Sequence, residues 1–152
     1  MKIILAASGG GHLEQIKQLD SLKEEHTVRY LVTKNKVNRS AKEYLFVPEF
    51  RNNRSFVIKA FDLFRIFAMS FFLILKERPD VVISTGAAAT YPICWFQKKL
   101  RHKKVIYIES FARKAGGSKT GLMVYKFADS FVVQRKELLS VYPKAVYGGM
   151  IY

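Results

Sequence analysis

The chain has 152 residues, of which 49% are hydrophobic, and this composition suits one folded domain with a core and excludes a disordered chain. Lys and Arg number 26 against 12 Asp and Glu, and the formal net charge of +14 favours an anionic partner: nucleic acid, an acidic lipid surface or a phosphorylated substrate. The single cysteine, Cys94, excludes an internal disulfide, and the three scattered histidines provide no metal-ligand cluster. We therefore expect one domain, 1–152, with no metal or cofactor.

Strand-like and helix-like patterns alternate along the chain. The first part of the chain is expected to form a strand at Ile3–Ala7, a helix at Gly11–Lys23, a strand at Thr27–Val32 and a long basic connection at Lys34–Arg54 around the apolar piece Tyr44–Val47. The middle part is expected to form a helix at Phe56–Lys76, a strand at Val81–Ser84, a turn at Thr85–Ala89 into a helix reaching about Leu100, and a strand at Val105–Ile108. The last part is expected to form a loop at Glu109–Gly117, a helix at Ser118–Phe127, a strand at Ser130–Val133, a short helix at Arg135–Val141 and a last strand at Ala145–Tyr147. This alternation predicts an α/β fold, with a Rossmann-like parallel sheet and helices on both faces.

The first strand runs into three consecutive glycines, in the sequence Ser8-Gly9-Gly10-Gly11-His12. Glycines let backbone N–H groups approach a phosphate closely, and a helix that starts there adds partial positive charge. The alternative is a plain tight turn between a strand and a helix. His12 follows directly and has the pKa range of a general base or of a donor to phosphate, although helix capping or local packing would also account for it.

Two further loops are expected at the same edge of the sheet, namely Thr85–Thr90 and Glu109–Ser118. Both are rich in small residues and both precede a helix. In a parallel sheet, ligands bind beyond the carboxyl ends of the strands. Three such loops at one edge predict a binding cleft there.

The glycine loop does not fit the common nucleotide motifs. A dinucleotide fingerprint needs a third glycine where this chain has Glu14, and an acidic residue where the second strand ends in Thr33-Lys34. A P-loop is also absent, because no Gly-Lys-Ser/Thr follows at the required spacing. These mismatches argue against a self-contained enzyme that uses a nicotinamide cofactor.

Several motifs, taken together, resemble one group of proteins in order and spacing. They are Ser8-Gly-Gly-Gly-His12-Leu-Glu14, Ser84-Thr-Gly86, Tyr107-Ile-Glu109-Ser110 with Arg113, Ala128-Asp129 and Val133-Gln134. This pattern resembles the bacterial capsule and exopolysaccharide proteins of the PssD/CpsF type, which are related to the membrane-anchoring subunit of the eukaryotic two-subunit UDP-GlcNAc transferase. A more distant likeness is to MurG, whose first loop also has a Gly-Gly-His ending. The resemblance covers essentially the whole chain.

The resemblance implies the N-terminal half of a GT-B glycosyltransferase, encoded as a separate chain. A catalytic partner would bind the UDP-sugar, while this chain would bind a polyprenyl-diphosphate saccharide acceptor. The acceptor site would comprise Ser8, Gly9, Gly10, Gly11, Thr85, Gly86, Ser110 and Arg113. His12 and Glu109 are the candidate catalytic residues; the alternative for Glu109 is a salt bridge to Arg113 or Lys114. Lys114 and Lys119, around Gly116-Gly117, would bind phosphate or only solvate the loop.

The segment Phe56–Leu75 is apolar on nearly all sides. Three charges, Lys59, Asp62 and Arg65, argue against a spanning helix, since each costs about 2.5–3.5 kcal/mol near the bilayer centre. A 152-residue domain would not bury every one of these side chains, so we expect part of the helix to touch the bilayer interface. The expected contacts with an anionic, cytoplasmic membrane surface, peripheral in character, are Lys59, Phe61, Phe64, Arg65, Phe71 and Phe72, with Arg51 and Arg54 upstream.

The last residues, Tyr142 to Tyr152, are apolar and aromatic and are read either as a contact with the partner chain or as a frayed end. The competing interpretation of the whole chain is a basic, Rossmann-like nucleic-acid-binding module. The net charge is its only support, because the sequence has no recognition motif and the Phe cluster favours lipid.

Overall fold

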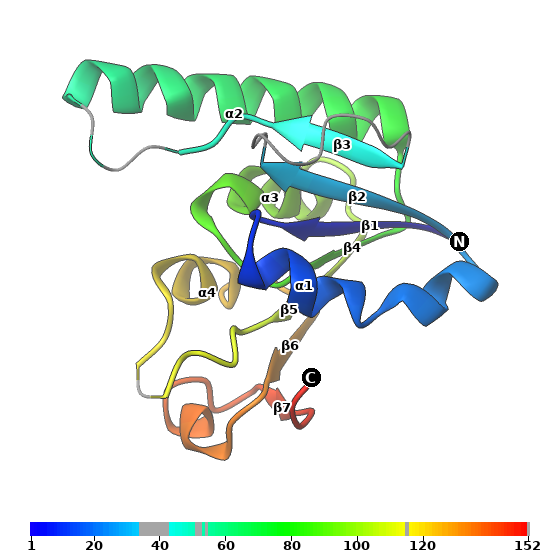
Figure 1. Cartoon of the computed structure of the whole chain (residues 1–152), viewed down its shortest axis with the longest axis vertical. Helices are drawn as coiled ribbons and strands as arrows, with labels where there is room; N and C mark the ends of the chain where they lie inside the picture. The colour runs from blue at the N-terminus through cyan, green and yellow to red at the C-terminus, as the bar shows by residue number, and fades with distance from the viewer. Residues whose placement is uncertain (34–42, 51–52, 54, 115, 152) are drawn as a thin grey trace.

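The computed structural model describes residues 1–33, 43–50, 53, 55–114 and 116–151. In this part of the chain, seven strands form one parallel sheet in the order β3-β2-β1-β4-β5-β6-β7 (Figure 1). The strands are β1 (Lys2–Ala7), β2 (Thr27–Thr33), β3 (Tyr44–Val47), β4 (Val81–Ser84), β5 (Lys104–Ile108), β6 (Ser130–Val133) and β7 (Val146–Tyr147). The predicted Rossmann-like parallel sheet is confirmed.

Helices cover both faces of the sheet, but unequally. The helical elements are α1 (Gly11–Lys17), α2 (Phe56–Glu77), α3 (Tyr91–Lys99), α4 (Lys119–Val124) and the 3-10 helices η1 (Asp20–Glu24), η2 (Ala88–Thr90) and η3 (Lys136–Ser140). Side chains of α2, α3 and α4 share one buried cluster with one face of the sheet, whereas α1 packs on the other face. The central strands are therefore buried on both faces, as their continuous apolar sequences predict.

Two helices are shorter than expected. The helix expected at Gly11–Lys23 ends at Lys17, because Gln18 and Leu19 donate to the carbonyls three residues back, and the chain continues as η1. The helix expected at Ser118–Phe127 spans only α4. The apolar pattern extends past both ends because Leu22 and Phe127 still pack against the sheet clusters.

The apolar piece Tyr44–Val47, expected only as part of a connection, is the edge strand β3. It pairs in parallel with Tyr30–Thr33 of β2. Four apolar residues inside a basic segment are only a weak indication of a strand. The strand forms because β2 provides the hydrogen-bond partners for its backbone. The rest of the connection, at 34–42, 51–52 and 54, lies outside the described residues.

The C-terminal end of α2 is fixed by a buried carboxylate. Glu77 accepts from Lys2 Nζ at 2.7 Å and from Arg29 at 2.8 Å, so it joins α2 to β1 and β2. The helix then ends at Arg78, whose φ of 48° is left-handed, and Pro79 follows. Burial opposes the charged form of Glu77, but the hydrogen bonds from Lys2 and Arg29 lower the pKa of this carboxyl below its usual value.

We expect Glu77→Gln to lower the free energy of unfolding by about 2 kcal/mol at neutral pH, because the hydrogen bonds to a charged group are lost. A carboxyl whose folded pKa is depressed stabilises the fold above its unfolded pKa and loses that contribution as the pH falls through the folded pKa. Urea titrations should therefore show the stabilities of the two proteins converging in acid, as the Glu77 carboxyl becomes protonated. The exposed Glu14→Gln serves as the control and should change stability by less than about 0.5 kcal/mol. A difference between Glu77→Gln and wild type that persists unchanged in acid would contradict this role.

Candidate functional site

The centre of the sheet contains the point at which the strand order reverses. β1 is followed along the chain by β2 on one side, while β4 lies on its other side. In such sheets the crevice beyond the carboxyl ends at this point is the usual ligand site. Thr85 joins the two loops there: its N–H donates to Ala6 O at 3.2 Å, and its Oγ1 donates to His12 O at 3.0 Å.

A cleft of about 620 Å³ opens at this edge. It is lined by His12 after β1, Gly86 and Ala87 after β4, and Tyr107, Ser110, Ala112, Arg113, Gly117, Ser118, Lys119 and Thr120 from the end of β5 to α4. Of the predicted site residues, the cleft brings together His12, Gly86, Ser110 and Arg113. The others in these loops, Ser8, Gly9, Gly10, Gly11, Thr85 and Glu109, are not among the described residues that line it.

The charged side chains that line the cleft are basic. Arg113 and Lys119 contribute cations, and no Asp or Glu belongs to the described lining. Tyr107, which belongs to one of the quoted motifs but had no expected site role, adds a hydroxyl from the end of β5. Burial, and then the charge of Glu109, raise the pKa of Tyr107, so this phenol stays protonated at neutral pH. The cleft therefore suits an anion with hydroxyl groups.

His12 reaches the cleft from the first turn of α1. Its Nδ1 is buried and has no hydrogen-bond partner within the part of the chain that the structure describes. A Cβ at Gly86 would make an ordinary contact with His12 Cε1 at 3.5 Å but would lie only 2.8 Å from Tyr107 Oη, so the loop after β4 passes the tyrosine this closely only because position 86 is glycine. The φ of 108° at Gly86 requires glycine as well. A buried, unpartnered imidazole nitrogen in a cleft is suited to contact a bound ligand.

The glycine loop is partly engaged by the protein itself. The N–H of Gly9, expected to face a phosphate, donates to Thr33 Oγ1 at 3.0 Å. Gly10 takes a left-handed φ of 78°, and its carbonyl accepts from Leu13 and Glu14 at the start of α1. A Cβ added at Gly10 or Gly11 would meet nothing within 4 Å, so the space beside these two glycines is open.

Glu109 has a role that its sequence context did not reveal. The residue is only 1% exposed, and its carboxylate accepts from the N–H of Ser110, the N–H and hydroxyl of Ser118 and the hydroxyl of Tyr142, at 2.7–3.1 Å. The alternative considered for Glu109, a salt bridge to Arg113 or Lys114, is not among its described contacts. These bonds occupy both carboxylate oxygens, so Glu109 holds the loop that carries Arg113 rather than facing a sugar.

Two glycines make this arrangement possible. A Cβ at Gly117 would lie 2.2 Å from the hydroxyl oxygen of Tyr142, and a Cβ at Gly121 would lie 2.2 Å from Glu109 Oε2. Both distances are shorter than any real contact, so a side chain at either position would displace the network. Burial, and then the hydrogen bond to Glu109, raise the pKa of Tyr142, which therefore stays a donor.

The expected membrane-contact residues differ in exposure. Phe61, Phe64 and Phe72 are 58%, 71% and 69% exposed on the outer side of α2. Phe71 is instead partly buried, because its ring packs edge-on against Phe96 of α3 at 5.4 Å between centroids. Lys59 is also partly buried, and Arg65 is exposed, with its guanidinium 5.6 Å from the centre of the Phe61 ring.

The exposed apolar side chains of α2 form a stripe along the helix, here called the aromatic ridge. It is defined by Val57, Phe61, Phe64, Phe72 and Leu75, which recur every three or four residues or multiples of that spacing. At 1.5 Å per residue the ridge is about 27 Å long. Among the described helices, none combines the length and the apolar character needed to cross a membrane. The described residues also contain no group of three or more His, Cys, Asp or Glu placed to hold a metal ion.

We expect Tyr142→Phe to lower the free energy of unfolding by about 2 kcal/mol, because a buried charged acceptor loses one of its donors. Tyr147→Phe is the matched control, since Tyr147 is 44% exposed and should tolerate loss of its hydroxyl within about 0.5 kcal/mol. Urea denaturation measures both values. Equal stabilities for the two variants would show that the Glu109 network contributes nothing to the fold.

Comparisons with known proteins support a specific family. A family model described as "Oligosaccharide biosynthesis protein Alg14 like" matches residues 2–151. The human UDP-N-acetylglucosamine transferase subunit ALG14 is 30% identical over 179 aligned positions, which cover 99% of this chain and 83% of that protein. The mouse subunit of the same name is 28% identical over 180 positions, with the same coverage.

Solved structures share the fold at low sequence identity. UDP-GlcNAc 2-epimerase from Methanocaldococcus jannaschii superposes with a TM-score of 0.72 at 16% identity, covering 99% of this chain but 46% of the epimerase. MurG from Acinetobacter baumannii superposes with a TM-score of 0.70 at 14% identity, covering 90% of this chain and 42% of MurG. The chain thus spans less than half the length of these enzymes, in agreement with the expected half of a GT-B-like fold. On the match over residues 2–151, the chain belongs to the family of Alg14-like oligosaccharide biosynthesis proteins.

Proposed function

We propose that this chain is the acceptor-binding subunit of a two-chain glycosyltransferase that acts in lipid-linked oligosaccharide or polysaccharide biosynthesis. The observation that carries the proposal is the basic cleft at the reversal of strand order, where His12, Arg113 and Lys119 line a space without a described acidic residue. Family membership supports a role in sugar transfer, since the human relative is named as a UDP-N-acetylglucosamine transferase subunit. A polyprenyl-diphosphate saccharide is anionic and bears hydroxyls, so it suits this cleft better than a nucleic acid does.

The proposal assigns acceptor binding to this chain and UDP-sugar binding to a second chain, because this chain corresponds to only part of a complete enzyme. The chain matches less than half of the solved epimerase and MurG chains, which have the same fold in this part. A second chain would supply the half that binds the UDP-sugar and close over the carboxyl edge of the sheet. The exposed Val146, Tyr147 and Met150 near the C-terminal end are part of the proposed contact with it.

The acceptor would lie with its diphosphate between the open space beside Gly10 and Gly11 and the cations of Arg113 and Lys119. Backbone N–H groups and cations stabilise such a dianion without forming a covalent bond. In the transfer step the acceptor hydroxyl attacks the anomeric carbon of the donor sugar, UDP leaves with the bonding electrons, and a base takes the hydroxyl proton. His12 and a residue of the partner chain are the two candidates for that base.

Attachment to the membrane is the second part of the proposal. The aromatic ridge exposes large apolar side chains that the described residues leave uncovered, and exposed patches of this kind mark interaction surfaces. Arg65 on the same helix, together with the net charge of +14, favours an anionic surface. We propose peripheral docking on the cytoplasmic side of the membrane. The finer assignment to capsule or exopolysaccharide synthesis of the PssD/CpsF type belongs to the same proposal.

The subunit assignment predicts that the purified chain alone transfers no sugar from UDP-N-acetylglucosamine to a polyprenyl-diphosphate saccharide. Co-purification with the UDP-sugar-binding chain should restore transfer, measured with radiolabelled donor. The control is the partner chain alone, which should be equally inactive. Rapid transfer by the isolated chain would refute the two-chain proposal.

The docking surface predicts that Phe64→Gln combined with Phe72→Gln abolishes flotation with vesicles of phosphatidylglycerol and phosphatidylcholine, because the apolar area that enters the interface is lost. Leu122→Gln, on the exposed side of α4, is the matched control and should float like the wild type. Flotation of wild type should weaken as salt is added. A double variant that floats normally would rule out the ridge as the membrane contact.

A further inference from the structure

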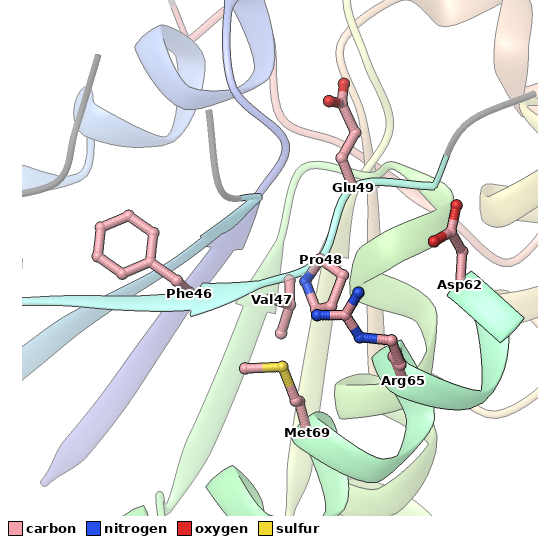
Figure 2. A pocket seen from close by; sticks show the side chains of 7 residues that line it. All are labelled: Phe46, Val47, Pro48, Glu49, Asp62, Arg65 and Met69. Carbon is pink, nitrogen blue, oxygen red and sulfur yellow. The ribbon is translucent and has the colours of Figure 1, made fainter. Parts of the chain in front are cut away.

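A second pocket lies between the edge strand β3 and α2, away from the cleft (Figure 2). Its volume is about 410 Å³, and it is lined by Phe46, Val47, Pro48 and Glu49 from the end of β3 and by Asp62, Arg65 and Met69 of α2. Figure 2 shows Arg65 and Met69 of α2 next to Val47 and Pro48. A concave, largely apolar space of this size with a few charged groups is typical of a small-molecule site.

The sheet register connects this pocket to the glycine loop. Val47, which lines the pocket, pairs with Thr33 of β2. Thr33 in turn accepts the hydrogen bond from Gly9 in the loop after β1. Since neighbouring strands lie about 4.8 Å apart, the pocket begins about 10 Å from the glycine loop, at the same edge of the sheet.

Four of the seven lining residues are apolar, namely Phe46, Val47, Pro48 and Met69, and the other three are charged. Val47 and Met69 form its floor and one side. Arg65 borders both the pocket and the ridge, because its guanidinium lies 5.6 Å from the ring centre of Phe61. Glu49 and Arg65 are exposed, whereas Asp62 is buried. A chain that enters from the ridge would meet Val47, Pro48 and Met69, with Glu49 and Arg65 at the exposed rim.

We propose that this pocket binds the isoprene units next to the diphosphate of the lipid acceptor. The inference rests on the proposed function, because it takes the diphosphate to lie at the glycine loop. An apolar chain leaving that loop toward the ridge reaches the pocket after crossing β2 alone. The acyl chain of a phospholipid has similar chemistry, so the test separates the branched chain from a straight one.

The test compares three ligands with the same diphosphate head on the purified full chain: dimethylallyl, farnesyl and dodecyl diphosphate, each measured by calorimetry below its micelle concentration. Farnesyl diphosphate should bind at least about tenfold more tightly than dimethylallyl diphosphate, because its additional isoprene units bury apolar surface. Dodecyl diphosphate should bind less than about threefold more tightly than dimethylallyl diphosphate. An equal gain with dodecyl diphosphate would identify a general lipid-chain site and overturn the isoprenoid assignment.

Two substitutions at one position probe the pocket itself. Met69→Trp fills it, and Met69→Gln keeps the side-chain length while making the wall polar; Met69 is 38% exposed, so both variants are compatible with the fold. In each variant, farnesyl diphosphate should bind less than about threefold more tightly than dimethylallyl diphosphate, and the affinity for dimethylallyl diphosphate itself should be unchanged. Leu63→Trp on the same helix adds bulk outside the pocket and should retain the full difference in affinity between farnesyl and dimethylallyl diphosphate. An unchanged gain in both Met69 variants overturns the proposal.

Two further measurements distinguish a failure of this inference from a failure of the proposed function: the binding of farnesol, which lacks the diphosphate, and the effect of Gly11→Ala. A methyl group at Gly11 enters open space, so the variant should fold normally while obstructing a diphosphate. If dimethylallyl diphosphate fails to bind wild type but farnesol binds and loses affinity in Met69→Trp, the pocket stands and the diphosphate site is wrong. If dimethylallyl diphosphate binds and Gly11→Ala weakens it without any farnesyl gain, the diphosphate site stands and the pocket assignment is wrong.

Discussion

The buried carboxylate of Glu109 is the interaction on which the rest of the cleft depends. Its two oxygens gather donors from Ser110, Ser118 and Tyr142, which lie on separate segments of the chain. The loop between Ser110 and Ser118 is thereby closed on itself and fixed to the segment after η3. Because a buried charge without its donors is costly, the network stabilises the positions of Ser110 and Ser118, the two ends of the loop that carries Arg113.

The unequal covering of the sheet gives the molecule two different sides. One face packs under α2, α3 and α4, where Phe67 and Phe71 of α2 meet Phe96 of α3. That packing uses only the inner side of α2, and the aromatic ridge remains outside. A helix that is apolar all round is thus divided between core and surface, and Phe71 and Phe72, although adjacent, belong to different sides.

The sequence predicted the alternation of elements and a cleft formed by three loops at one edge, with His12 and Gly86 among its residues, because strand patterns and small-residue turns are local signals. It did not predict that Glu109 would be saturated by hydrogen bonds, since Tyr142 lies 33 residues away along the chain. The contact between Gly9 and Thr33 depends in the same way on strand register. The pocket beside β3 was missed because it lies between a strand and a helix that share no sequence motif.

The placement of α2 relative to the strands has a geometric consequence. Its first turns extend past the carboxyl ends of the strands, on the side where the glycine loop and the cleft open (Figure 1). With the ridge docked on a membrane as proposed, the carboxyl edge of the sheet, where the cleft opens, lies on the side of the molecule reached by the first turns of α2. An acceptor could then be found by lateral diffusion within the leaflet, and its chain would never have to leave the bilayer completely. The search for substrate becomes two-dimensional, while the UDP-sugar and the partner chain arrive from the aqueous side.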